Sequence, residues 1–84
     1  MLRHMPTVFR AKGYRFGFFM FDLGEPMHVH VFRGKGGYQC KVWMASLQVV
    51  WSHGFTPAEL RDIVQLVEAH REEIVKAWKA RETK

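Results

Sequence analysis

The hydrophobic positions of the chain follow two different periods, one before residue 52 and one after residue 56. From Thr7 to Trp51, short runs of β-branched and aromatic residues are separated by glycine-containing turns, a pattern typical of strands. We expect strands at residues 7–12, 14–21, 28–33, 38–44 and 47–52. Their short connections predict that neighbouring strands are antiparallel.

A helix is predicted to follow the strands. Thr56 can cap its first turn, Pro57 suits the first helical position, and Glu59 can complete a capping box. Apolar residues then recur at steps of three and four up to about residue 80: Leu60, Ile63, Val64, Val67, Ile74 and Trp78. The sequence therefore predicts an α+β fold, in which a small antiparallel sheet of four to five strands (about 7–52) packs against one long C-terminal helix (about 57–80).

The 84 residues suit one domain, which we expect to span residues 6–84. Residues 1–5 are expected to be a flexible N-terminal extension or a cloning scar. No apolar run approaches the roughly 18 residues that span a bilayer, so we expect no membrane partner. Cys40 is the only cysteine; it excludes an internal disulfide and fits the reducing cytoplasm, where we expect the protein to be located.

The alternation of side chains along the strands fixes which residues share a face. If Val29 and Val31 point toward the helix, a second set points away from it: His28, His30, Phe32, Gln39, Lys41 and Trp43. The reverse register would bury an unpaired lysine against an apolar helix, which costs several kcal/mol. We therefore expect the histidines, the lysine and the aromatic rings to form an exposed binding face.

The positive charge is concentrated in the strand region. Residues 1–54 hold seven lysines and arginines against Asp22 and Glu25, whereas residues 55–84 hold six residues of each sign. Such a distribution favours a polyanion or an acidic partner, because each phosphate contact releases condensed counterions. The residues that we expect to bind are Arg10, Arg15, Arg33 and Trp43.

His28 and His30 form a His-x-His pair whose chemistry leaves three alternatives open. With Lys41 on the adjacent strand, they could act as an acid and a base in metal-independent RNA cleavage, with the ammonium stabilising the phosphorane-like transition state. They could also be two ligands of a metal, although His53 or His70 would then have to complete the set. The third alternative is hydrogen bonding across the sheet or contact with a partner. We expect no cofactor, and leave open whether the protein is an enzyme.

Residues Pro26 to Val31 form a Pro-x-His-x-His-Val segment, which is fairly specific. Through this segment and others across residues 5–80, the chain resembles a known bacterial family, the domain of unknown function 4160. Members of the family resemble small toxin–antitoxin or phage-linked proteins, often encoded beside a second tiny protein. The resemblance implies a small antitoxin-like protein partner and a toxin that acts on RNA, but it implies no catalytic residue.

Two functional hypotheses follow. The first is a toxin-like component of a two-protein module, which engages RNA through the basic and aromatic face and cleaves it if His28, His30 and Lys41 are catalytic. The second is a non-catalytic module that uses the same face to bind a protein partner or to form a homodimer. A metal-binding protein is the third alternative.

Overall fold

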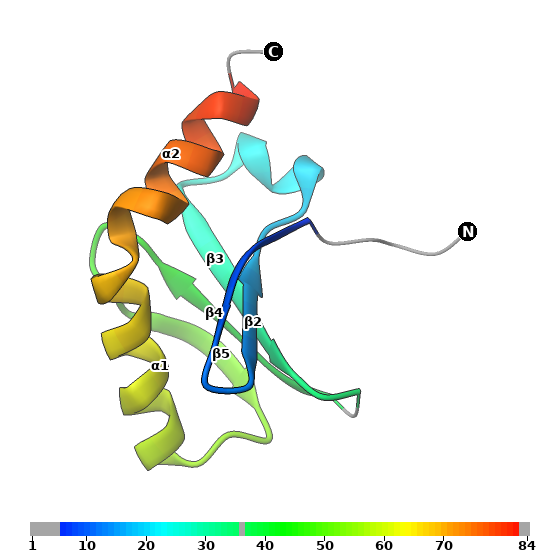
Figure 1. Ribbon diagram of the computed structural model, residues 1–84, viewed down its shortest axis with the longest axis vertical. Coiled ribbons are helices and arrows are strands. Elements are labelled where there is room, and N and C mark those ends of the chain that lie inside the picture. Colours follow the sequence, from blue (N-terminus) through cyan, green and yellow to red (C-terminus); the bar gives the residue numbers. More distant parts are fainter. Residues whose placement is uncertain (1–5, 36, 83–84) are drawn as a thin grey trace.

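The computed structural model describes residues 6–35 and 37–82 and has an α+β fold, as predicted (Figure 1). Residues 1–5, for which we expected an extension, lie outside the described residues. The elements, in chain order, are β1 (Thr7–Ala11), β2 (Tyr14–Gly17), the 3-10 helix η1 (Met20–Gly24), β3 (His28–Arg33), β4 (Tyr38–Trp43), β5 (Val49–His53), α1 (Pro57–Ala69) and α2 (Arg71–Glu82).

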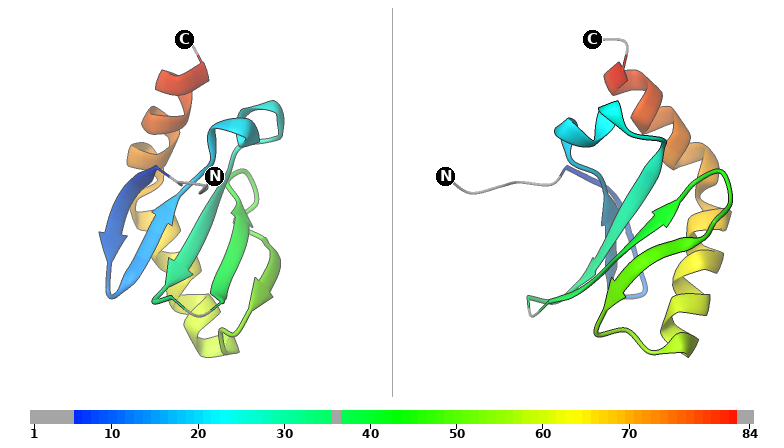
Figure 2. Two further views of the ribbon diagram at one scale, coloured as in Figure 1. Left: turned by 90° about the vertical axis from the view of Figure 1, so that its right-hand side faces the viewer. Right: turned by 180° about the vertical axis from the view of Figure 1, so that it is seen from behind.

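The five strands form one antiparallel sheet in the order β1-β2-β3-β4-β5. Both α-helices lie against the same face of this sheet, and Figure 2 shows them behind it in the left-hand view. The opposite face is not covered by a helix, except at one end, where η1 lies next to α2. No helix in the described part of the chain is long and apolar enough to cross a membrane.

The core lies between the sheet and the helices. Val29 and Val31 on β3 are fully buried, together with Cys40 and Val42 on β4. On the helix side they join a cluster that includes Ile63, Val67 and Ile74. The predicted register of β3 and β4 is therefore confirmed, because the residues that alternate with the valines belong to the other face.

The segment predicted to end the second strand forms η1 instead. β2 ends at Gly17, and a short helix begins at Met20. The carboxylate of Asp22 accepts a hydrogen bond of 2.8 Å from the backbone N–H of Phe19, which caps the first turn of η1. The aromatic residues of this segment favour a strand, but the local hydrogen bond stabilises the short helix instead.

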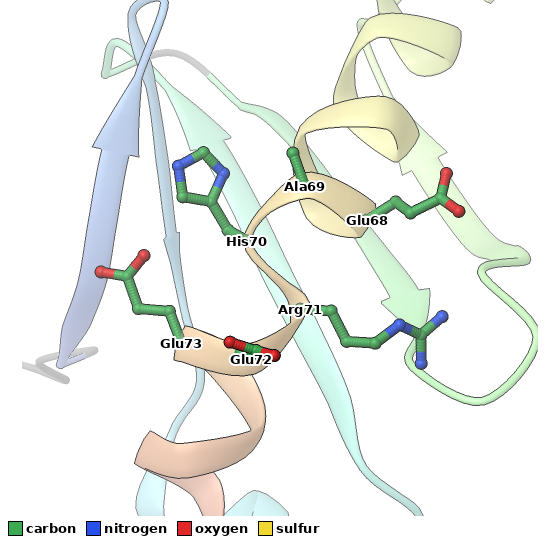
Figure 3. A pocket seen from close by; sticks show the side chains of 6 residues that line it. All are labelled: Glu68, Ala69, His70, Arg71, Glu72 and Glu73. Carbon is green, nitrogen blue, oxygen red and sulfur yellow. The ribbon is translucent and has the colours of Figure 1, made fainter.

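The predicted single C-terminal helix is two helices that meet at His70, which has φ −108° and ψ 20°. A shallow hollow of about 490 Å³ lies at this junction (Figure 3). His70 turns toward β1, where its ring stacks on Phe9 at 4.0 Å between centroids. Arg71 points the other way and donates to the carbonyl of Met44 at 3.0 Å. Side chains on both sides of the junction therefore fix the change of direction.

The N-terminus of α1 is formed as the sequence predicts. Thr56 and Glu59 make the reciprocal hydrogen bonds of a capping box, at 3.1 and 2.8 Å. Glu59 also accepts from Arg33 at 2.6 Å, which joins the end of β3 to the first turn of α1.

Candidate functional site

A buried cluster of three titratable side chains lies where η1 meets the end of β3. Oδ2 of Asp22 is 3.4 Å from Nε2 of His28 and 3.2 Å from Nε2 of His30. All three residues are buried, with His28 fully so and His30 8% exposed. The two histidines share the face that the sequence predicts, but η1 covers them, so that face is not open at this end.

His28 is held by contacts on every side. Its Nδ1 is 2.8 Å from the backbone carbonyl of Pro26, so Nδ1 carries the hydrogen and donates it. Its ring makes edge contacts with the rings of Trp43 and Trp78, at 5.7 and 5.3 Å between centroids. Trp78 belongs to α2, so this helix closes one side of the cluster.

The Nε2 atoms of both histidines are buried and have no hydrogen-bond partner. The contacts of these two atoms with Oδ2 of Asp22, at 3.4 and 3.2 Å, therefore do not have the geometry of hydrogen bonds. Burial lowers the pKa of His30 because it penalises the imidazolium, and the nearby carboxylate of Asp22 opposes this shift in part. Within the described residues, Asp22, His28 and His30 are the only group of three such side chains that could hold a metal ion, with the three ligand atoms within 4.8 Å of one another.

Lys41 lies beside the cluster but its ammonium is already paired. Its Nζ is 2.8 Å from Oε1 of Glu25 and lies 4.8 Å from the centre of the Trp43 ring. The hydrogen bond from Lys41 lowers the pKa of the Glu25 carboxyl. The structure thus brings the predicted site residues His28, His30 and Lys41 together at one end of the sheet, with Asp22 and Glu25 as partners that the sequence analysis did not identify.

Away from η1, side chains of all five strands form a surface that we call the open face. It consists of two rows that run across the paired strands and the ring of Trp43 beside them. One row is Arg10, Arg15, Phe32, Gln39 and His53. The other row is Lys41 and Trp51, next to His30, which η1 covers. Of these residues, Trp51 is 40% exposed.

The position of Trp51 depends on an irregularity in β5. Lys41 pairs with Trp51 and the next residue, Val42, pairs with Val49, so Val50 is an extra residue. In a regular strand Val49 and Trp51 would share a face. The extra residue lets Val49 pack against the core while Trp51 lies 6.1 Å from the ring of His30 on the open face. The alternation rule alone therefore could not place this tryptophan.

Arg15 and Arg33 have different surroundings. The guanidinium of Arg15 lies over the Phe32 ring at 5.2 Å, on the open face. Arg33 does not join it, because it pairs with Glu59 and lies over the rings of Tyr14, Tyr38 and Phe55 on the helix side. Of the expected binding residues, Arg10, Arg15 and Trp43 are thus grouped and Arg33 is not.

The other two histidines in the described region do not complete the cluster. His53 is exposed in the first row of the open face, and His70 is held between Phe9 and the carbonyl of Leu66. The third member of the cluster is Asp22, which no spacing in the sequence connects to His28 and His30.

Comparison with known protein families assigns the chain to one of them. The family described as Domain of unknown function (DUF4160) matches residues 13–79. The chain belongs to this family. The matched part of this DUF4160 protein contains β2 to β5, η1, α1 and most of α2, and so includes both the buried cluster and most of the open face. The searches of curated proteins and of solved structures found no match.

Proposed function

We propose that this DUF4160 protein binds single-stranded RNA on the open face and acts as the toxin-like component of a two-protein module. The observation that carries the RNA-binding part is the row of basic and aromatic side chains on the part of the sheet face that neither η1 nor the α-helices cover. The resemblance of the family to toxin–antitoxin proteins supports the two-protein part.

The composition of the sheet supports a polyanionic ligand. The open face contains Arg10, Arg15 and Lys41, and the five strands contain no aspartate or glutamate. Phosphates therefore meet no repulsive carboxylate within the strands, and each contact with a basic side chain adds a favourable, salt-dependent contribution.

The aromatic side chains support a single strand over a duplex. Trp51 and Phe32 lie on the two adjoining rows of the open face, and Arg15 stacks on Phe32. Unpaired bases stack on such rings, and each stack contributes about 1–3 kcal/mol with little dependence on base identity. Bases in a duplex already stack on each other and present mainly phosphates, so the exposed rings add little there.

Cleavage of RNA by His28, His30 and Lys41 stays a prediction, and this conformation supports binding more than cleavage. Both Nε2 atoms lie in the buried cluster beside Asp22, and the ammonium of Lys41 is paired with Glu25. An acid–base pair must reach the proton that it transfers, so cleavage by these residues requires η1 to move.

A second candidate function, docking of a protein partner, is favoured by the tip of η1. Met20 is 49% exposed and Phe21 is 63% exposed. Neighbouring large apolar side chains of this kind are typical of protein interfaces. This tip lies beside the open face, so a small protein partner could dock there and cover the RNA-binding rows, as an antitoxin would.

RNA binding is tested by fluorescence anisotropy with a labelled 12-nucleotide single strand and the matching duplex. We expect Trp51→Ala and Arg15→Ala to weaken binding to the single strand. The matched control for arginine is Arg61→Ala, which removes an exposed charge from α1 on the helix side. If the wild-type protein binds no RNA, or if Arg61→Ala weakens binding as much as Arg15→Ala, the proposal fails.

The two-protein part is tested by co-expression with the product of the adjacent gene. We expect a stable complex and relief of any growth arrest, and we expect Met20→Ser with Phe21→Ser to prevent complex formation. Light scattering distinguishes a homodimer of this chain from a complex with a partner. A homodimer that buries Met20 and Phe21 and excludes the second protein would contradict the proposal.

A further inference from the structure

The cluster of Asp22, His28 and His30 gathers three potential metal ligands in a buried site. The carboxylate of Asp22 and the imidazole of His28 are more than nine-tenths buried, and the side chain of His30 is 11% exposed. Neither Nε2 atom has a hydrogen-bond partner. A buried polar atom without a partner costs about 1–3 kcal/mol, and here there are two such atoms in one place.

The hydrogen bond of His28 determines whether its Nε2 atom directs a hydrogen or a lone pair toward Asp22. The carbonyl of Pro26 can only accept, so the 2.8 Å contact places the hydrogen of a neutral imidazole on Nδ1. In this neutral form, which is the form that binds a metal, Nε2 carries a lone pair and lies 3.4 Å from Oδ2 of Asp22. Two acceptors that face each other in a buried site repel, unless a positive centre lies between them.

We propose that Asp22, His28 and His30 bind one divalent transition-metal ion of the zinc class. Two imidazole nitrogens and one carboxylate oxygen are a donor set that suits zinc and its first-row neighbours, and is poorly suited to Mg²⁺ or Ca²⁺. This inference goes beyond RNA binding and does not depend on it.

Two of the three distances between the ligand atoms agree with such a site, and all three atoms lie within 4.8 Å of one another. In a tetrahedral site with bonds of about 2.0–2.1 Å, the ligand atoms lie about 3.3–3.4 Å apart. Oδ2 of Asp22 is 3.4 and 3.2 Å from the two Nε2 atoms. Ligands of one metal point at the metal and not at each other, so they show short separations without hydrogen bonds, as these atoms do.

Outer contacts hold two of the three ligands in place. The hydrogen bond from Nδ1 of His28 to the carbonyl of Pro26 is the kind of bond that orients a metal-binding histidine. The backbone N–H of Phe19 holds the carboxylate of Asp22. η1 and the turn before β3 therefore position the donors before any ion arrives.

Three protein ligands leave one position of a tetrahedral site for water or a substrate. His30 is the least buried of the three, and its ring lies near Trp51 and Phe19. The fourth ligand would therefore enter from the open face, so the proposed ion would lie at its edge.

Calorimetric titration of the chelator-treated full chain with Zn²⁺ tests the site. We expect one Zn²⁺ per chain, and excess Mg²⁺ should not compete. Asp22→Asn keeps an oxygen that can accept from Phe19 but removes the charge, and His30→Gln removes a less buried ligand. Each should weaken Zn²⁺ binding by about 100-fold or more, beyond the roughly 10–100-fold loss typical of an outer-contact variant.

The controls separate this site from adventitious binding by other histidines. His53→Gln changes a histidine outside the cluster and should leave the affinity unchanged. Circular dichroism checks that each variant is folded, and Co²⁺ in place of Zn²⁺ should give the visible absorption of a tetrahedral complex in the wild-type protein only. The proposal is overturned if the wild-type protein binds no Zn²⁺, if folded Asp22→Asn and His30→Gln bind it normally, or if His53→Gln loses it.

Discussion

The indole of Trp78 meets the imidazole of His28 edge-on, with 5.3 Å between the ring centroids. This contact joins the last turns of α2 to the first residue of β3. Trp78 also lies 4.8 Å from the ring of Phe18, in the segment that leads into η1. One side chain of α2 thus closes the buried cluster and holds η1 against the sheet.

Replacing Trp78 should therefore destabilise the fold strongly. A buried tryptophan truncated to alanine costs about 3–5 kcal/mol, a large part of the about 5–15 kcal/mol that stabilises a small domain. We expect Trp78→Ala to lower the free energy of unfolding by about 3–5 kcal/mol. Urea titration followed by far-ultraviolet circular dichroism measures this change. Lys79→Ala, at the neighbouring exposed position, should change it by less than about 0.5 kcal/mol. Equal effects of the two substitutions would show that Trp78 does not hold η1 and α2 together.

Acid should weaken the contact between β3 and α1. The backbone N–H of Thr56 and the guanidinium of Arg33 lower the pKa of Glu59 below its ordinary value of 4.5. A carboxyl group whose pKa is lower in the folded state than in the unfolded state stabilises the protein at pH values above the unfolded-state pKa. This contribution is lost as the pH falls through the folded-state pKa. Glu59→Gln should therefore flatten the pH dependence of stability below about pH 4.5. A profile of Glu59→Gln that equals the wild type would contradict this account.

The single thiol should be inert in the folded protein. Cys40 is fully buried, and burial raises its pKa to about 12. Because the thiolate is the reactive form, an aromatic disulfide reagent at pH 8 should modify Cys40 only as fast as the protein opens. In denaturant, one thiol per chain should react at once. Fast and complete modification of the native protein would show that the sheet and helices do not cover β4 as described.

Much of the fold could be predicted from local patterns. The alternation in β3 and β4 predicts which side chains reach the core, because burying Lys41 unpaired would be costly. Thr56 and Glu59 identify the first turn of α1, since capping depends on residues only three positions apart. These features are local, and short segments determine them.

The features that the sequence did not reveal depend on contacts between distant segments. η1 replaces the end of the second predicted strand because Asp22 caps it and α2 packs against it. Apolar residues keep their helical spacing on both sides of His70, so periodicity could not show that α1 ends there. The burial of His28 depends on Trp78, fifty residues further along the chain. For these reasons the sequence placed the two histidines on the correct face but could not show that they are covered.

Nuclear magnetic resonance gives the most direct test of RNA binding on the open face, because the three indole N–H signals report three different environments. Trp43 and Trp51 belong to the open face, whereas Trp78 is buried and its indole donates to Glu82 at 3.0 Å. On titration with a 12-nucleotide single-stranded RNA, we predict that the signals of Trp43 and Trp51 shift and that the signal of Trp78 does not. A shift confined to Trp78, or saturable RNA binding that leaves all three signals unchanged, would contradict the account.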